Sequence, residues 1–209
     1  RALPYEDNAF DAVQIAGSNG KGSTARMLER TLRETGQSVG FYTQPHLDDV
    51  RERIRTDGRK IPRSAVATFV EEVREYINER AAVGDGPTFF EVMTALSLWE
   101  FARQDVDVAI LEVGIGGRFD ATSVVDPVAS AVTSVSLEHT DLIGDTIEEI
   151  AHDKAHVAPD DAPLVTGVTG EGLESIRAVA GDVVTVGEGD DADVRAIYRG
   201  RTNHTEAAV

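Results

Sequence analysis

The segment GSNGKGST at residues 17–24 combines residue types that bind phosphate. Its three glycines let the backbone wrap closely around an anion, Lys21 supplies a cation, and Ser23 or Thr24 could reach a metal ion. The general phosphate-loop pattern places the lysine directly before the Ser or Thr, whereas here Gly22 separates them. The segment predicts a nucleotide site with an unusual loop. The alternative is a glycine-rich turn with Ser23 as a helix N-cap.

A second candidate is Glu112, near the end of the apolar stretch VDVAILEVG at 106–114. Burying a carboxylate costs free energy unless it is paired or bound to a metal ion, so Glu112 is a candidate ligand for a hard cation such as Mg²⁺. A glycine-rich loop with Arg118 and Asp120 follows it. The alternative is a carboxylate that accepts hydrogen bonds from nearby backbone amides.

His139 follows another apolar stretch, at 128–135, so its imidazole could face the same crevice. A single histidine is more often structural or solvated, and only the other loops give it weight. Its neighbours Glu138, Thr140 and Asp141 are further polar candidates.

Lys154 is one of only three lysines in the chain and lies on a predicted helix. From the residues alone, we expect a surface lysine paired with Glu149 or Asp153.

The candidates are embedded in alternating strand and helix patterns. A hairpin is expected around Asp57 and Gly58, and Ser64 is the expected N-cap of the helix that follows. The alternation predicts an α/β fold with a mostly parallel sheet flanked by helices, in which ligands bind beyond the carboxyl ends of the strands. The loops described above are therefore expected to meet. The expected strands are 12–17, 38–43, 106–114, 128–135, 163–167 and 183–187, and the expected helices are 23–36, 62–82, 88–104, 146–158 and 171–180.

Composition narrows the class of protein further. The net charge is -17, so nucleic acid is an unfavourable partner. Seventeen arginines against three lysines, with many aspartates, fit a protein adapted to a high-salt cytoplasm, and an ordinary acidic protein is the alternative. No membrane span or signal peptide is visible, and cysteine is absent, which excludes disulfides and thiolate chemistry. The first residue is not Met, so we expect a piece of a longer protein.

Six stretches together resemble the motifs of folylpolyglutamate synthase and dihydrofolate synthase, ATP-dependent ligases of the Mur ligase superfamily. The resemblance spans about residues 12–160, and the family's phosphate loop carries the same extra glycine. In order along the chain, the stretches are GSNGKGST, YTQPHLDDVRERIR, TFFEVMTALSLWEFA, LEVGIGGRFDAT, SLEHTDLIG and IAHDKAHV.

This resemblance implies roles for particular residues. It implies a P-loop NTPase-like domain of the Mur ligase central type over 1–209, a separate glutamate-binding domain outside this chain, and Mg²⁺ as cofactor, with K⁺ as a further candidate. Lys21, Lys154 and His139 would be catalytic, with Lys154 carbamylated to support a second metal ion. The ATP phosphates would be held by Asn19, Gly20, Lys21, Gly22 and Ser23. The pterin of the acid substrate would be contacted by Thr88, Phe89, Phe90, Glu91, Phe119, Asp120 and Ala121, and Mg²⁺ would be held by Glu112, His139 and Gln44.

Two positions depart from the family pattern. Gln44 stands where the family has a serine that binds magnesium, so either the Gln44 carbonyl, Thr43 or water would have to serve there. Ser123 replaces an asparagine in the loop after Glu112.

The implied reaction joins the carboxylate of dihydropteroate or a folate to the amino group of L-glutamate, with ATP forming an acyl phosphate. We expect the 209-residue chain to bind ATP weakly and not to catalyse ligation alone. Two alternatives stay open: a Mur-type ligase of cell-wall synthesis, which shares the loop and the metal residues, and a regulatory P-loop ATPase, which would act as a switch.

Overall fold

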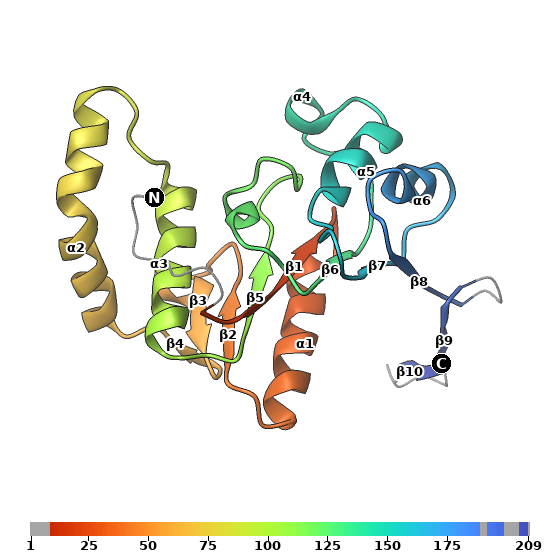
Figure 1. Ribbon diagram of the computed structural model, residues 1–209, viewed down its shortest axis with the longest axis horizontal. Coiled ribbons are helices and arrows are strands. Elements are labelled where there is room, and N and C mark those ends of the chain that lie inside the picture. The colour runs from red at the N-terminus through yellow and green to blue at the C-terminus, as the bar shows by residue number, and fades with distance from the viewer. Residues whose placement is uncertain (1–8, 189–191, 199–204, 209) are drawn as a thin grey trace.

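The protein is a single mostly parallel β-sheet with helices on both faces (Figure 1). The computed structural model describes residues 9–188, 192–198 and 205–208. The strands are β1 (Asp11–Ala16), β2 (Val39–Tyr42), β3 (Ile54–Thr56), β4 (Arg59–Lys60), β5 (Val108–Glu112), β6 (Ala129–Val132), β7 (Leu164–Thr166), β8 (Val183–Gly187), β9 (Val194–Tyr198) and β10 (Thr205–Ala208). The helices are α1 (Lys21–Glu34), α2 (Arg63–Ala82), α3 (Phe89–Arg103), α4 (Thr140–Ile143), α5 (Ile147–Ala155) and α6 (Gly170–Arg177), with short 3₁₀ turns η1 (Val50–Arg53) and η2 (Ala121–Val124).

The strand order is β10-β9-β8-β7-β6-β1-β5-β2-β3-β4. β1 pairs in parallel with both β5 and β6, and β2 pairs in parallel with β5. The carboxyl ends of these four strands therefore lie at one edge of the sheet, where the strand order changes direction around β1. The predicted α/β class and parallel sheet are confirmed, and the predicted hairpin is formed by β3 and β4.

The central strands are buried because helices cover both of their faces. All five residues of β5 are buried, as a strand covered on both sides requires. On one face, Ile15, Phe41 and Ile110 pack with residues of α1. On the other face, the sheet packs against α2 and α3 near β2 and against α5 and α6 near β6 and β7.

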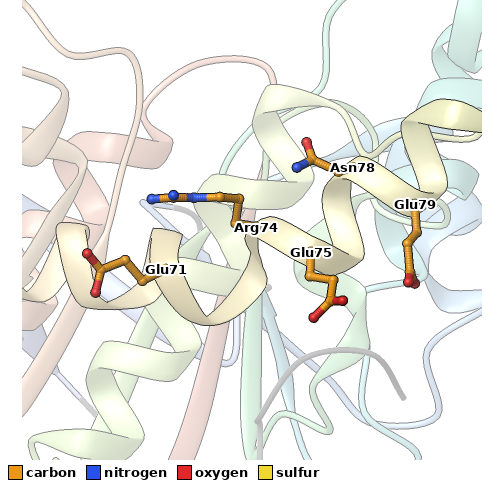
Figure 2. A pocket seen from close by; sticks show the side chains of 5 residues that line it. All are labelled: Glu71, Arg74, Glu75, Asn78 and Glu79. Atoms are coloured by element: carbon orange, nitrogen blue, oxygen red, sulfur yellow. The ribbon is translucent and has the colours of Figure 1, made fainter.

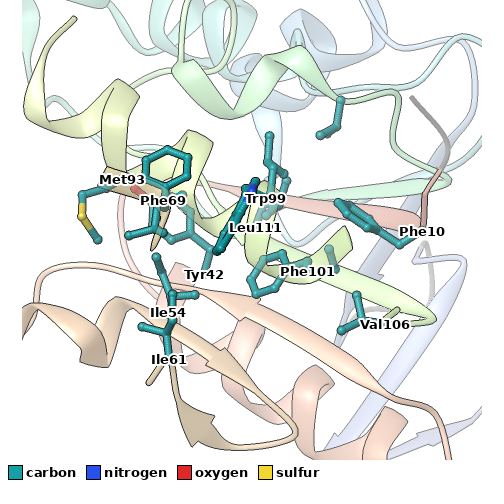
Figure 3. Close-up of a cluster of buried hydrophobic side chains, with 14 of the residues drawn as sticks. Phe10, Tyr42, Ile54, Ile61, Phe69, Met93, Trp99, Phe101, Val106 and Leu111 are labelled. Atoms are coloured by element: carbon teal, nitrogen blue, oxygen red, sulfur yellow. The ribbon is translucent and has the colours of Figure 1, made fainter. Parts of the chain in front are cut away.

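The largest cluster of buried side chains fills the space between the sheet and the two helices α2 and α3 (Figure 3). Phe69 of α2 and Trp99 of α3 pack with ring centroids 5.6 Å apart, and Tyr42 is fully buried beneath α3. These contacts fix α3 against β2 and β5. The amino-terminal end of α3 lies at the same edge of the sheet as the carboxyl ends of the strands (Figure 1).

The N-cap of α2 is not the residue that the sequence predicts. The expected N-cap Ser64 is wrong, because α2 begins at Arg63 and Pro62, two residues before Ser64, occupies the N-cap position without a side-chain hydrogen bond. By contrast, Thr88 caps α3: its hydroxyl accepts a hydrogen bond from the Glu91 amide, and the Glu91 carboxylate accepts one from the Thr88 amide. This capping box orients the start of α3 at the sheet edge.

Candidate functional site

The phosphate-loop segment joins β1 directly to α1, in the arrangement that such a loop requires. Gly20, with φ of 85°, occupies the N-cap position and makes no side-chain cap, so the alternative of Ser23 as N-cap is wrong. The first helical hydrogen bond within this turn runs from the Thr24 amide to the Gly20 carbonyl at 2.9 Å. The amides of residues 21–23 are therefore left without intrahelical acceptors, as at any helix start, and an anion could accept their hydrogen bonds.

The Lys21 side chain folds back over this loop. Its ammonium donates to the Gly17 carbonyl at 2.7 Å and to the Ser18 carbonyl at 3.4 Å. Burial, together with the charge of Lys154, holds the pKa of Lys21 below its ordinary value, although nearby carboxylates oppose the shift. A partly buried cation held only by carbonyl groups is well placed to exchange them for phosphate oxygens.

The loop after β6 supports the phosphate loop from the side. The Ser18 amide donates to the Ser134 carbonyl at 2.8 Å, and the Ser136 amide donates to the Ser18 hydroxyl at 2.9 Å. The Thr133 hydroxyl donates to the Asn19 carbonyl at 2.7 Å. Two of the loops predicted to meet are thus joined by hydrogen bonds between backbone groups and between side-chain hydroxyls and backbone groups.

Glu112 explains the extra glycine of the phosphate loop. Its side chain is buried, and a Cβ placed on Gly22 would lie 3.3 Å from Glu112 Oε2. The missing side chain at Gly22 lets the start of α1 approach this carboxylate closely. Glu112 Oε2 also accepts hydrogen bonds from the Thr43 hydroxyl and, at 3.2 Å, from the Gln44 amide. The predicted metal ligand therefore lies directly beside the predicted phosphate-binding helix start.

Lys154 is not on the surface, and the expected pairing with Glu149 or Asp153 is wrong. The Lys154 side chain is 2% exposed, and its ammonium lies 2.8 Å from Glu138 Oε1. The buried ammonium is stabilised by this ion pair, because Glu138 lies in the loop after β6 and extends toward α5 at the sheet edge. Although partial burial opposes the shift, hydrogen bonds from Lys154 and Ser18 lower the pKa of Glu138 below its ordinary value.

His139 is less well integrated than the other candidates. It follows Glu138 and precedes α4 in a left-handed conformation with φ of 48°, and its side chain is exposed. Among the described residues, no three His, Asp or Glu side chains gather as a metal-binding group. Magnesium commonly takes only one or two carboxylates and completes its shell with phosphate oxygens and water, so Glu112 fits such an ion when a nucleotide is present.

A pocket of about 570 Å³ is lined by Gln44, whose backbone contacts Glu112, and it brings together the two segments predicted to contact a pterin. Phe89 and Phe90 come from the start of α3, and Phe119 comes from the glycine-rich loop after β5. The residues that line the pocket are Gln44, Arg53, Thr88, Phe89, Phe90, Glu91, Gly114, Ile115, Phe119, Asp120 and Ala121.

The carboxylates in this pocket wall are already engaged. Glu91 caps α3, and Asp120 accepts hydrogen bonds from the amides of Gly114 at 2.9 Å, Ile115 at 3.2 Å and Thr122 at 2.9 Å. These hydrogen bonds fix the backbone of the segments that enclose the pocket. They leave the aromatic rings as its principal contact surfaces.

Arg53 lines the same pocket and was not predicted. Its guanidinium carbon lies 5.3 Å from the centroid of the Phe89 ring, and its Nε donates to His46 Nδ1 at 2.9 Å. It is the single cationic residue among those that line the pocket. Arg53 lies in the stretch YTQPHLDDVRERIR together with Arg51 and Arg55, and the sequence does not indicate which of the three reaches a pocket.

Gln44 stands between the two halves of the site. Its backbone amide contacts Glu112, whereas its side chain lines the pocket, where the amide nitrogen Nε2 is buried without a hydrogen-bond partner. The side chain is therefore directed to the pocket and not to the carboxylate that would hold a metal ion.

Another hollow, of about 460 Å³, lies on α2 and is unrelated to this site (Figure 2). Its lining side chains follow one another along a single helix face, and no predicted site residue is among them. They are Glu71, Arg74, Glu75, Asn78 and Glu79. No helix in the described part of the chain is both long enough and apolar enough to cross a bilayer.

Comparison with known proteins gives close relatives. The chain is 66% identical over 209 residues to a protein of Haloferax volcanii described as a probable bifunctional folylpolyglutamate synthase/dihydropteroate synthase; this covers 99% of the chain and 25% of the relative. It is 38% identical over 178 residues to the dihydrofolate synthase/folylpolyglutamate synthase of Bacillus subtilis, covering 84% of the chain and 41% of that protein. The chain therefore spans a quarter to two fifths of these relatives' length.

Solved structures share the fold. A structure described as an FPGS–AMPPCP complex matches with a TM-score of 0.83 and 33% identity, covering 93% of this chain and 49% of that one. Escherichia coli FolC in complex with DHPP and ADP matches with a TM-score of 0.79 and 32% identity, covering 98% of this chain and 46% of that one. The Mur ligase middle domain family matches residues 15–207. This match, over nearly the whole chain, places the protein in the Mur ligase middle domain family.

Proposed function

We propose that this chain is the ATP-binding part of a ligase that joins the carboxylate of dihydropteroate or a folate to the amino group of L-glutamate. The observation that carries the proposal is the contact between the Gln44 amide and Glu112. Gln44 also lines the aromatic pocket, and a Cβ on Gly22 of the phosphate loop would lie 3.3 Å from Glu112 Oε2, so Glu112 lies between the loop and the pocket. A phosphate donor and a flat acid bound in these two places would meet near Glu112.

The reaction needs an activated carboxylate, because a free carboxylate is a poor electrophile. Transfer of the terminal phosphoryl group of ATP to the acid gives an acyl phosphate, which the amine of glutamate then attacks as phosphate leaves. Lys21 would neutralise charge on the transferred group, and the helix amides of residues 21–23 would hold the phosphates. The pocket would hold the acid in line with the phosphoryl group.

A divalent ion would be held by Glu112 and phosphate oxygens, with the Thr43 hydroxyl or His139 as further donors. When bound, Mg²⁺ supplies charge neutralisation for the phosphoryl group. The buried carboxylate and the neighbouring hydroxyl are the hard oxygen donors that this ion prefers, which supports the assignment. K⁺ and a carbamate on Lys154 stay predictions; the structure has the free amine paired with Glu138.

The substrates divide between this chain and the rest of the protein in this proposal. The residues of this chain would form the sites for ATP and the flat acid, and glutamate would be bound by a domain outside this chain. We therefore expect the isolated chain to bind an ATP analogue without catalysing ligation.

The proposal is tested by calorimetric binding of AMPPCP and of dihydropteroate, and by ligation assays of the full-length protein with dihydropteroate and folate as separate acids. Lys21→Ala should abolish AMPPCP binding, and Lys60→Ala, at an exposed lysine of β4, should not. Turnover with a nucleotide-linked muramyl substrate in place of either acid would refute the proposal in favour of a cell-wall ligase. ATP-dependent dimerisation without dependence on either acid would refute it in favour of a regulatory ATPase.

A further inference from the structure

We propose that the side-chain amide of Gln44 binds the flat acid substrate in the pocket and determines part of its specificity, and that it is not a metal ligand. The inference rests on the proposed function, because it assigns a residue to the acid-binding pocket of that site.

The backbone around Gln44 directs its side chain away from the predicted metal position. Its backbone amide nitrogen donates to Glu112 Oε2 at 3.2 Å, which fixes the chain at the end of β2. The neighbouring Thr43 hydroxyl contacts the same carboxylate oxygen. Thr43 therefore already supplies an oxygen donor on the Glu112 side, and the longer side chain of Gln44 is free to serve the pocket.

Gly114 provides the space for this side chain. A Cβ placed on Gly114 would lie 3.0 Å from Gln44 Nε2 and 2.8 Å from the Cζ atom of Phe90, so any larger residue would crowd both. The amide and the aromatic ring consequently meet over the Gly114 backbone. A flat ligand stacked on the Phe90 ring would present its edge to the side-chain amide of Gln44.

The side-chain amide nitrogen of Gln44, Nε2, lacks a hydrogen-bond partner. It is buried and makes no hydrogen bond, and the nearby Asp120 carboxylate is occupied by backbone amides. A buried donor without an acceptor costs free energy. Because Nε2 makes no hydrogen bond in the free protein, the side-chain amide of Gln44 can rotate into the pocket without breaking one. A ligand that accepts from it would remove the cost.

The chemistry of a primary amide indicates the kind of ligand edge that it recognises. An amide offers one donor and one acceptor side by side, and it pairs with two hydrogen bonds to a flat ring that carries the complementary pair. A pteridine with a ring carbonyl beside a ring N–H presents such an edge. The inferred ligand class is thus a flat heteroaromatic carboxylic acid with an amide-like ring edge.

The test uses the full-length protein with Gln44→Met, which keeps the side-chain length and removes both polar atoms. The dissociation constant for dihydropteroate should rise about three- to tenfold, corresponding to one net hydrogen bond. The dissociation constant for AMPPCP and the Mg²⁺ concentration at half-saturation should not change. Tm should not fall, because an unpaired buried amide is replaced by an apolar group of similar shape. Gln44→Ser, which restores the family residue, should show the same loss of affinity.

Gln37→Met, at an exposed glutamine after α1, is the matched control and should change none of these values. Unchanged dihydropteroate affinity in Gln44→Met and Gln44→Ser, with wild-type binding intact, would overturn the Gln44 assignment and leave the proposed function standing. A higher Mg²⁺ requirement without loss of dihydropteroate affinity would overturn it in favour of a metal ligand. A wild-type protein that binds AMPPCP but no dihydropteroate would overturn both.

Discussion

The ammonium of Lys154 lies 2.8 Å from the carboxylate of Glu138, so that α5 is joined to the loop after β6 by a charge pair whose cationic member is almost wholly buried. The same carboxylate interacts with Ser18 and with the charge of Lys21. The pair therefore supports the phosphate loop as well as the helix. It also means that a carbamate on Lys154 would place a negative charge beside Glu138, which only a cation between them could offset.

Removal of the Glu138 charge should destabilise the protein. Glu138→Gln leaves a buried ammonium without its counter-ion, and we expect a loss of about 2–4 kcal/mol in the free energy of unfolding. The measurement is urea unfolding at constant salt, with Glu75→Gln on the exposed face of α2 as control. The double variant Glu138→Gln/Lys154→Met should recover most of the loss. If it is as unstable as the single variant, the charge pair is not the cause.

Gly22→Ala should separate nucleotide binding from stability. Alanine favours a helix by about 1 kcal/mol over glycine, which offsets the crowding of Glu112, so the free energy of unfolding should change little. AMPPCP affinity should fall about tenfold, because displacement of the helix start from Glu112 weakens the amide contacts to phosphate. Calorimetry measures this. Gly181→Ala, where a Cβ meets nothing within 4 Å, is the control. Full affinity in Gly22→Ala would show that the close approach is dispensable.

Thr88→Ala should cost about 1 kcal/mol of stability, the usual loss when an N-cap hydroxyl is removed. Ser64→Ala provides a sharp comparison, because Ser64 is also exposed near a helix start but makes no cap. We expect it to leave the midpoint of urea unfolding unchanged. Equal losses in the two variants would contradict the capping geometry.

Alkaline pH should reveal the burial of Tyr42. Burial raises the pKa of Tyr42 from 10.0 to about 12, with Asp120 contributing less and hydrogen bonds from Thr94 and Arg53 opposing the shift. Because the pKa is higher in the folded state, this contribution to stability is complete below pH 10 and is lost as pH rises from 10 to 12. Tyr42→Phe should show a shallower fall in urea stability over this range than wild type. Tyr76→Phe should follow wild type, and identical slopes in all three would contradict the assignment.

The sequence predicted the arrangement of the sheet because its signals are local. The apolar run that becomes β5 and the helical spacing of α1 need no knowledge of distant residues, and glycine-rich loops after strands already indicate the ligand-binding edge. The loops after the strands were expected to meet because parallel strands end at the same edge of the sheet.

The details that sequence analysis missed depend on contacts between separate elements. Lys154 lies among polar neighbours on its own helix, and only Glu138, in another loop, draws it inward. Arg53 reaches the pocket because η1 brings it against Phe89. Ser64 failed as a cap because the extended backbone conformation at Pro62, with ψ of 149°, makes Pro62 the last residue before the helix, two residues earlier than expected. No residue type or spacing encodes these outcomes.

The position of β1 between β5 and β6 has a consequence for how the protein comes into being. β1 and the phosphate loop leave the ribosome before their strand partners, which lie about one hundred residues further along the chain. Such pairing over long stretches of sequence is slow to nucleate. The phosphate loop of the nascent chain therefore lacks its hydrogen-bond partners until residues 129–136 have been synthesised. We expect the ability to bind nucleotide to appear late and abruptly during translation.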